Sequence, residues 1–254
     1  EMTSSLVGSE MCIRDRVRVG HRPAENTLSV TVSESLLPVL PEVLARIKNL
    51  FDLYCEPKAV YETLQVMNTL QPGLCVLGTR LPGCFNVFEM SVRAVLGQQI
   101  TVKAASTLAA RLVAVYGTQV QTGIEGLTHS FPAPAAILAL GENISEHLGK
   151  LGIISARANT IYQLARVLAD EKNDFGFCGN PEEEMQKLQA IRGIGSWTAQ
   201  YIAMRAMGWP DAFLPTDAGI KKALPDHTPK ELQVLSEAWR PWRSYATVNL
   251  WNTL

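Results

Sequence analysis

The chain has 254 residues, of which 47% are hydrophobic and 19% are charged, and 23 Lys and Arg residues nearly balance 24 Asp and Glu residues. This composition excludes a disordered low-complexity chain, and the lack of any apolar run of about 18 residues argues against a membrane-spanning helix. A net charge of -1 excludes a histone-like protein that binds nucleic acid through bulk positive charge.

The amino-terminal residues contain an unusual segment. Residues 11–16 read Met-Cys-Ile-Arg-Asp-Arg, the translation of a nucleotide string that resembles a transposon-end adaptor of sequencing libraries. We therefore hypothesise that residues 1–16 are a non-native, adaptor-derived tail. On this hypothesis the native protein begins further upstream and the chain is a fragment. The tail also lacks the basic and apolar regions of a signal peptide, so no export is predicted.

Residues 17–85 have a mixed pattern. Apolar and polar residues alternate over 28–32, which predicts a half-buried strand. Apolar residues then recur at helical spacing over 39–51, and the glycines and prolines of 68–83 predict turns at a domain junction. We expect a partial α+β domain over residues 17–85.

From residue 86 onward the chain reads as almost entirely helical, with short connections marked by glycine and proline. The expected helices cover residues 86–97, 101–116, 132–139, 143–149, 155–169, 181–191, 197–207, 218–224, 229–238 and 241–252. The predicted fold is mainly α: a helical domain over 86–254 with two lobes, at about 86–209 and 210–254, preceded by the small α+β domain.

The segment from Leu188 to Thr198 predicts a helix-hairpin-helix. Glycine suits the tight turn through Gly193-Ile194-Gly195, because it adopts positive φ and lets a backbone approach another surface closely. The amides near Gly195 then lie at the start of a helix, where a phosphate oxygen binds without any side-chain charge. The alternative is a plain turn between two helices.

Asp217 follows this hairpin, directly after Pro215-Thr216 and before an expected helix. An Asp in this position is a common N-cap, which is the alternative to a functional carboxylate. The two roles can coexist.

Together the hairpin and Thr216-Asp217 resemble the helix-hairpin-helix, Gly/Pro-rich, Asp (HhH-GPD) superfamily of DNA glycosylases. Within it, the chain is most similar to the bacterial 3-methyladenine DNA glycosylase II family. The resemblance runs from about residue 17 to residue 254 and includes the segments Phe51-Asp-Leu, Leu81-Pro-Gly-Cys-Phe, Val92-Arg-Ala-Val-Leu-Gly-Gln and Arg240-Pro-Trp-Arg-Ser-Tyr-Ala. It implies hydrolysis of the N-glycosidic bond to an alkylated purine that has been flipped out of duplex DNA.

The resemblance also implies roles for individual residues. The family's catalytic carboxylate corresponds to Asp217, and its aromatic base pocket to Trp197, Tyr201 and Trp251. Electron-rich rings favour the positively charged bases of 3-methyladenine and 7-methylguanine nucleosides. Without the resemblance, a Trp and a Tyr four residues apart read as ordinary helix core.

Two further positions distinguish this chain within the family. The bifunctional members carry a nucleophilic Lys where Trp197 stands, so we predict a monofunctional glycosylase with no lyase step. The residue that fills the gap left by the flipped base corresponds to Gln99, where familiar relatives have an apolar residue, and Gln98 is a second candidate for this wedge. The alternative is a pair of glutamines that meet solvent at a helix end.

The hairpin has two further implied roles. Its contacts with DNA phosphate fall on Gly193, Gly195 and Thr198. The family's structural monovalent cation, Na⁺ or K⁺, corresponds to the main-chain carbonyls of Gln189, Ile191 and Ile194. The alternatives for Arg240, Trp242, Arg243 and Tyr245 are contact with the DNA backbone, bracing of the pocket, or packing with the charged ends in solvent.

The cysteines and the family resemblance together predict the cofactors and partners. The chain has no cysteine after Cys178, so the iron–sulfur cluster of some relatives is not expected. The five cysteines form no CxxC pair and indicate a reducing bacterial cytoplasm. We expect a monomer that needs no cofactor, binds double-stranded DNA with alkylated bases and does not associate with membranes.

Two other functions stay open at this stage. One is a non-catalytic helix-hairpin-helix module that binds DNA within a larger alkylation-response protein. The other is a glycosylase for a different lesion, such as a deaminated or oxidised purine, which the Gln pair at 98–99 keeps open.

Overall fold

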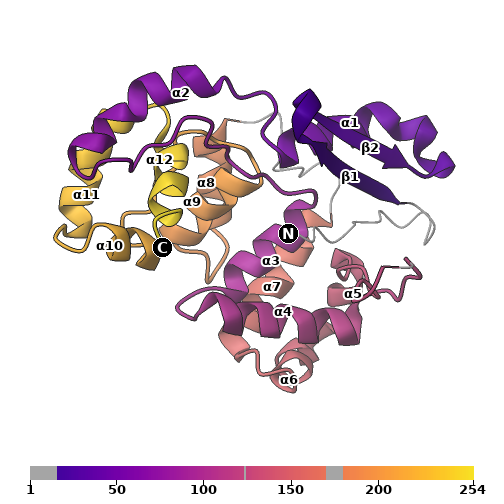
Figure 1. Ribbon diagram of the computed structural model, residues 1–254. Coiled ribbons are helices and arrows are strands. Elements are labelled where there is room, and N and C mark those ends of the chain that lie inside the picture. Colours follow the sequence, from indigo (N-terminus) through magenta and orange to yellow (C-terminus); the bar gives the residue numbers. More distant parts are fainter. Residues whose placement is uncertain (1–15, 123, 170–179) are drawn as a thin grey trace.

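The computed structural model describes residues 16–122, 124–169 and 180–254, so nearly all of the suspected adaptor tail lies outside the described residues. Figure 1 shows a two-stranded sheet with one helix beside it, next to two helical lobes. The strands β1 (Val17–Arg22) and β2 (Thr27–Val32) pair antiparallel, with Val17 opposite Val32. β2 confirms the strand expected at 28–32, and β1 adds its partner.

Helices make up most of the rest of the described chain. Their bounds are α1 (Leu40–Leu50), α2 (Pro57–Leu64), α3 (Val87–Leu96), α4 (Val102–Tyr116), α5 (Pro134–Leu138), α6 (Ile144–Gly149), α7 (Ser155–Leu168), α8 (Pro181–Gln189), α9 (Ser196–Arg205), α10 (Ala218–Ala223), α11 (Pro229–Leu235) and α12 (Arg243–Trp251). Short 3-10 segments cover Pro23–Glu25, Glu34–Val39, Gln65–Thr69, Gly141–Asn143 and Ser236–Trp239. Every helix expected between residues 86 and 252 is present, with its ends shifted by a few residues.

Side-chain caps explain why several of these helices begin where they do. Asn86 accepts a hydrogen bond from the Glu89 amide at the start of α3, and Thr101 accepts one from the Ala104 amide at the start of α4. Such caps satisfy amides that have no partner within the helix. Because these residues stand just before the apolar periodicity begins, sequence alone predicts the helix starts closely.

Two hydrophobic cores hold the helical part together. The first is built from buried residues of α3 to α9, such as Leu96, Ile161 and Leu188. The second combines α10 to α12 with α2 and the segment that follows α2, through residues such as Leu64 and Trp239. Figure 1 shows this arrangement, with α2 lying beside α11 and α12.

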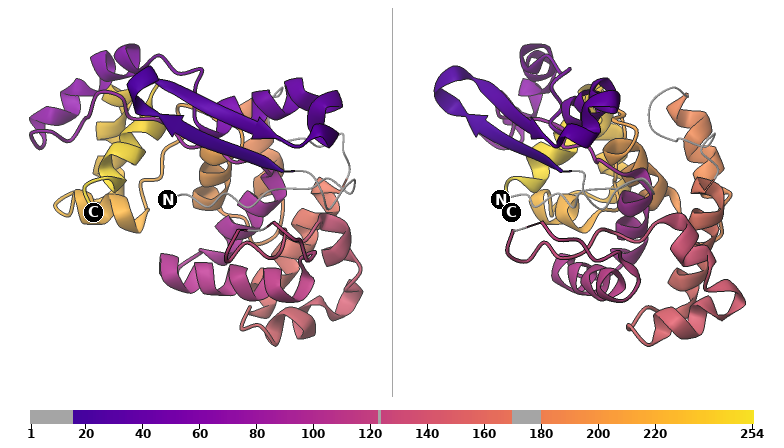
Figure 2. Two further views of the ribbon diagram at one scale, coloured as in Figure 1. Left: turned by 45° about the vertical axis from the view of Figure 1, so that its right-hand side comes forward. Right: turned by 90° about the vertical axis from the view of Figure 1, so that its right-hand side faces the viewer.

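The second core divides the chain differently from the boundary expected at residue 85. Val60, Leu64 and Leu81 lie in the core of the carboxy-terminal lobe, and α2 itself is absent from the sequence prediction. The α+β part is therefore limited to the hairpin β1–β2 and α1, while residues from about 57 to 81 complete the lobe that begins near residue 210. Figure 2 shows the β1–β2 hairpin beside the two helical lobes.

The junction between the two cores lies at α9. Tyr201 on this helix and Trp209, shortly after its end, pack against both of them. Within the described residues, no helix combines the length and the apolar character needed to cross a membrane.

Candidate active site

Helices α8 and α9 form the hairpin expected between Leu188 and Thr198. The turn places Gly193 at a φ of +96°, a left-handed conformation that favours glycine. A Cβ atom at Gly193 would lie 2.0 Å from the hydroxyl oxygen of Thr160, a residue of α7. Both the turn and the packing against α7 therefore require glycine here.

The start of α9 presents backbone amides to solvent. Gly195 is the N-cap residue of α9 and supplies no side chain to cap it, so the first amides of the helix lack intrahelical partners. Gly193 and Gly195 are both exposed. A phosphate oxygen can reach these amides, and the dipole of α9 favours an anion at this end. The phosphate-binding role of the two glycines stays a prediction that this geometry permits.

Thr198 does not share that surface. It is only 2% exposed, and its hydroxyl accepts a hydrogen bond of 2.9 Å from Nε2 of Gln98. The hydroxyl is thus not available to phosphate, and the phosphate contact expected at Thr198 stays a prediction that rests on its backbone amide at the start of α9. Thr198 lies in the first turn of α9, and its hydroxyl is used inside the protein by Gln98, in the turn after α3.

The carbonyls expected to hold a monovalent cation lie at the end of α8 and in the turn after it. The Ile191 carbonyl accepts the Ile194 amide over 3.0 Å. The carbonyl oxygens of Gln189 and Ile194 accept none of the backbone hydrogen bonds that lie outside the regular helices and strands of the described chain. Backbone oxygens are suitable ligands for a hard cation, so these residues fit the expected ion, and its binding stays a prediction.

Asp217 caps α10. Its Oδ1 accepts hydrogen bonds from the amides of Gly219, at 2.8 Å, and Ile220, at 3.1 Å. The N-cap interpretation is therefore confirmed. Capping fixes the carboxylate at the amino-terminal end of α10, where the helix dipole favours a negative charge.

Two indole groups from other helices hold the same carboxylate. Nε1 of Trp251, in α12, donates to Oδ1 over 2.8 Å, and Nε1 of Trp197, in α9, donates to Oδ2 over 3.0 Å. A carboxylate oxygen has about two lone pairs for such bonds. Oδ1 also accepts two backbone amides, whereas in the described part of the chain Oδ2 accepts from Trp197 alone. Oδ2 is thus the oxygen with capacity left for water or a substrate.

Trp197, Tyr201 and Trp251 form an aromatic cluster beside this carboxylate. The rings of Trp197 and Tyr201 are stacked, with centroids 5.2 Å apart and planes 9° from parallel. The Trp251 ring lies 6.3 Å from that of Tyr201, tilted by 49°. All three side chains are half-buried and pack against the second core. The expected pocket residues are therefore brought together with Asp217, each partly accessible.

Gly219 belongs to this site, although the sequence analysis does not single it out. A Cβ atom there would lie 2.7 Å from Cδ1 and 2.9 Å from Nε1 of Trp251. Only a glycine lets the indole approach the start of α10 closely enough to donate to Asp217. The signal available in the sequence is its place two residues after the capping Asp.

The two glutamines after α3 differ sharply in their surroundings. Gln99 is exposed and has a φ of +53°. Gln98 is half-buried, and its Nε2 donates to the Gly193 carbonyl over 3.0 Å as well as to Thr198. Gln98 forms hydrogen bonds within the protein, so of the two expected wedge residues Gln99 is the one exposed to solvent.

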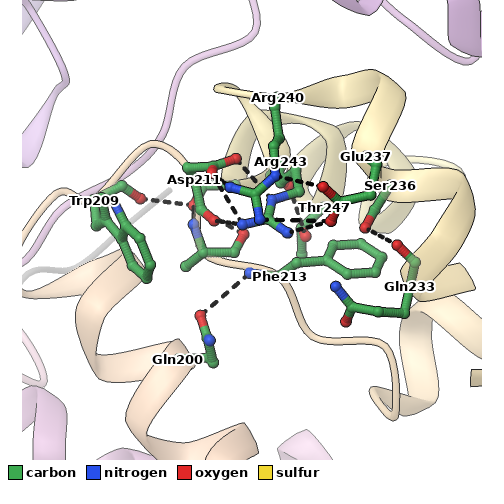
Figure 3. A network of polar contacts seen from close by, with 12 residues as sticks. Gln200, Trp209, Asp211, Phe213, Gln233, Ser236, Glu237, Arg240, Arg243 and Thr247 are labelled. Atoms are coloured by element: carbon green, nitrogen blue, oxygen red, sulfur yellow. Dashed lines mark hydrogen bonds and ion pairs between the residues drawn. The ribbon is translucent and has the colours of Figure 1, made fainter. Parts of the chain in front are cut away.

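The cations near the carboxyl end of the chain form an internal network, shown in Figure 3. Arg243 is 6% exposed, and its guanidinium donates to both carboxylate oxygens of Asp211, over 2.7 and 2.9 Å. Arg240 bonds to the same carboxylate and to Glu237. Arg243 packs inside the protein, but its charged end is buried against Asp211 rather than in solvent, and this partner was not predicted from the sequence.

Two family models match the chain. The model described as HhH-GPD superfamily base excision DNA repair protein matches residues 92–243, and the AlkA N-terminal domain matches residues 9–86. The chain belongs to the HhH-GPD superfamily. The resemblance identified from the hairpin and Thr216-Asp217 is thereby confirmed. Trp197, Tyr201 and Asp217 lie within the HhH-GPD match, whereas Trp251 lies beyond it.

Similar proteins extend this result. The chain is 38% identical to DNA-3-methyladenine glycosylase 2 of Escherichia coli over 230 residues. The aligned region covers 91% of this chain and 78% of that protein. The chain is 40% identical over 216 residues to the Mycobacterium tuberculosis protein named "Probable bifunctional transcriptional activator/DNA repair enzyme AlkA", covering 83% of this chain but only 42% of that protein. The solved 3-methyladenine DNA-glycosylase of Archaeoglobus fulgidus has the same fold, with a TM-score of 0.76 at 22% identity over 92% of this chain and 81% of that chain.

Proposed function

We propose that this protein is a monofunctional DNA glycosylase that hydrolyses the N-glycosidic bond of alkylated purines in duplex DNA, the first step of base excision repair. The observation that carries the proposal is a carboxylate, Asp217, fixed by two indole N–H groups beside the stacked rings of Trp197 and Tyr201. A module that only binds DNA needs the hairpin but has no use for this arrangement. The names of the similar bacterial proteins support an alkylated base as the substrate.

In the proposed reaction, Asp217 acts on the sugar side of the flipped nucleotide. As the glycosidic bond breaks, positive charge develops on the deoxyribose ring, and a fixed carboxylate stabilises it. Its less engaged oxygen, Oδ2, is suited to orient or deprotonate the attacking water. The four donors around the carboxylate hold it in place before the reaction begins, which reduces the reorganisation that the transition state requires.

The aromatic cluster selects the base. 3-Methyladenine and 7-methylguanine carry positive charge while attached to the sugar, and the faces of Trp197 and Tyr201 attract such a cation. Because the base leaves as a neutral molecule, the enzyme has less of the barrier to lower. Trp197 occupies the place of the lyase nucleophile, and an indole forms no Schiff base, so the reaction ends at the abasic site.

Binding to duplex DNA is proposed to rest on the exposed amides at Gly193 and Gly195 rather than on net charge. A monovalent cation at the carbonyls of Gln189, Ile191 and Ile194 would add positive potential beside this phosphate site. We propose that the protein acts as a monomer and requires no redox or organic cofactor.

The test uses a duplex with a single 7-methylguanine and compares the wild type with Asp217→Asn, which keeps the size and a capping oxygen but removes the charge. Strand breaks are read with and without alkali under single-turnover conditions. The proposal predicts breaks only after alkali, and a rate reduced by at least about a hundredfold in the variant. Asp226→Asn, an exposed carboxamide substitution in the same lobe, is the matched control and should behave as the wild type.

A second function is favoured by one observation. The chain spans 42% of a relative whose name combines transcriptional activation with DNA repair, as expected for a DNA-binding module of a larger protein. If the wild type and Asp217→Asn bind the duplex equally and neither releases base, this module is the better description. Breaks that appear without alkali contradict the monofunctional assignment.

A further inference from the structure

The turn that follows α3 and the hairpin are joined by the side chain of Gln98. Its single amide nitrogen, Nε2, donates to the carbonyl of Gly193 over 3.0 Å and to the hydroxyl of Thr198 over 2.9 Å. One acceptor lies in the turn of the hairpin and the other in the first turns of α9. The two contacts therefore fix Gln98 against both the turn and the start of α9.

Helix α7 holds the same two segments from the other side. The Arg157 guanidinium donates to the backbone carbonyl of Gln98, and the Thr160 hydroxyl lies 3.0 Å from the Arg192 carbonyl, to which it donates. A Cβ atom on Gly193 would collide with Thr160, so the hairpin is packed tightly against α7. The turn, the hairpin and α7 form one hydrogen-bonded unit in which Gln98 is the direct connection between turn and hairpin.

Gln99, the neighbour of this connection, has a backbone conformation that needs support. Its φ of +53° lies in the left-handed region, which is unfavourable for a residue with a side chain. Such conformations persist where the surrounding structure fixes them. Gln98 is fixed at its carbonyl by Arg157 and at its side chain by the hairpin, so the direction in which Gln99 leaves the protein surface is set by these bonds.

We propose that Gln98 is a positioning residue that couples DNA phosphate binding at the hairpin to the insertion of Gln99 into the duplex. This inference rests on the proposed function for its DNA substrate. When the hairpin engages the backbone of the DNA, the Gln98 bridge holds Gln99 in register with the base pair to be opened. Without the bridge the hairpin still binds, but Gln99 no longer meets the duplex in the correct orientation.

This role predicts a dependence on base pairing. Opening a stable pair requires unstacking and unpairing, and a lesion in a mismatch requires less. A defect in the insertion of Gln99 must therefore be large for a lesion in a stable pair and small for the same lesion in a mismatch. A merely structural role, in contrast, lowers both activities equally.

The variants remove one or both hydrogen bonds of the bridge. Gln98→Met keeps the length of the side chain and removes the donor of both bonds, and Thr198→Val keeps the shape and removes one of the two acceptors. Thr198→Ser keeps the hydroxyl and tests rescue. Gln71→Met makes the same change at an exposed glutamine outside the unit and serves as the control. Urea unfolding of each variant verifies that it folds.

Two readouts are measured: duplex affinity, and the fluorescence of 2-aminopurine placed beside the target base, which reports flipping and needs no base release. We expect Gln98→Met and Thr198→Val to lose most of the fluorescence change in a stable pair, to retain it in a mismatch, and to keep duplex affinity within about threefold. The excision rate for a stably paired 7-methylguanine should fall by about tenfold or more. Thr198→Ser and Gln71→Met should match the wild type.

Because Gln98→Met already removes the bond to Thr198, the effects of Gln98→Met and Thr198→Val should also be non-additive, with the double variant close to Gln98→Met. Equal losses in stable pairs and mismatches, a parallel loss of duplex affinity, or no flipping signal in the wild type overturns the proposal. If the wild type flips but releases no base, the proposed glycosylase function fails while the coupling through Gln98 stands.

Discussion

The hydroxyl of Tyr245 donates a hydrogen bond of 3.2 Å to Oδ1 of Asp52, which joins α12 to the end of α1. The other oxygen of Asp52 accepts the Leu81 amide over 2.8 Å, and Arg80 donates to the Asp52 carbonyl over 2.8 Å. The helix that carries Trp251 is thus attached to the amino-terminal part of the chain. Asp52 lies in the Phe51-Asp-Leu segment of the family resemblance, and the structure gives this segment a physical role.

The Asp52 carboxyl makes stability depend on pH. Burial raises its pKa above the ordinary value of 3.8, against the opposing effect of the Leu81 amide and the Tyr245 hydroxyl. A carboxyl whose pKa is higher in the folded chain binds its proton more tightly there, so its contribution to stability is complete below the unfolded pKa and is lost as the pH rises through the folded pKa. The stability of the wild type relative to that of Asp52→Asn should therefore fall as the pH rises above about 4.

Urea unfolding at several pH values provides this comparison. Glu62→Gln, a change at an exposed carboxylate of α2, is the control and should keep the wild-type pH dependence. An identical pH dependence of stability in the wild type and in Asp52→Asn would contradict the assignment to Asp52. The pKa of Tyr245 is also raised, mainly by burial, so the tyrosine stays neutral in this range and does not confuse the result.

Gly219→Ala should separate base release from DNA binding. The added Cβ would lie 2.7 Å from Trp251 Cδ1, so the indole must move and its bond to Asp217 is broken. We expect the single-turnover excision rate to fall by about ten- to a hundredfold, because small displacements of positioning groups have such effects. Duplex affinity should stay near the wild-type value, since the hairpin is untouched.

The control for this prediction is Gly149→Ala, at a helical glycine with no atom within 4 Å of the added Cβ. It should leave both the excision rate and the affinity unchanged. An unchanged rate in Gly219→Ala would show that the contact between Trp251 and Asp217 is not needed for base release.

The Asp211–Arg243 pair should contribute strongly to stability. Their side chains are 10% and 7% exposed, and removing one partner of a buried pair leaves the other charge without compensation. Asp211→Ala should lower the unfolding free energy by about 3 kcal/mol, near the lower end of the usual range because Glu237 still contacts Arg243. Urea unfolding measures the loss, and Asp226→Ala, at an exposed carboxylate, should change stability by less than about 0.5 kcal/mol.

Local patterns predicted the helices of both lobes because capping residues and apolar periodicity act within one helix. They did not predict the second core, in which the short helix α2 is stabilised by distant residues of α11 and α12. Asp52 and Tyr245 are 193 residues apart, and no local pattern connects them. The same applies to the site: the family resemblance selected Asp217 and its aromatic neighbours, but the bonds from both indoles and the roles of Gly219 and Gln98 depend on tertiary packing.

The two indole donors to Asp217 should differ in importance. Trp251→Phe keeps an aromatic ring but removes the donor to Oδ1, which still accepts two backbone amides, whereas Trp197→Phe removes the donor to Oδ2 and leaves that oxygen without a partner in the described chain. Trp197 also stacks on Tyr201. We therefore expect the excision rate for 7-methylguanine to fall about tenfold in Trp251→Phe and further in Trp197→Phe, with duplex affinity nearly unchanged in both. Trp242→Phe, an aromatic substitution away from the carboxylate, is the control, and a larger loss in Trp251→Phe would identify Oδ1 as the oxygen whose position matters more.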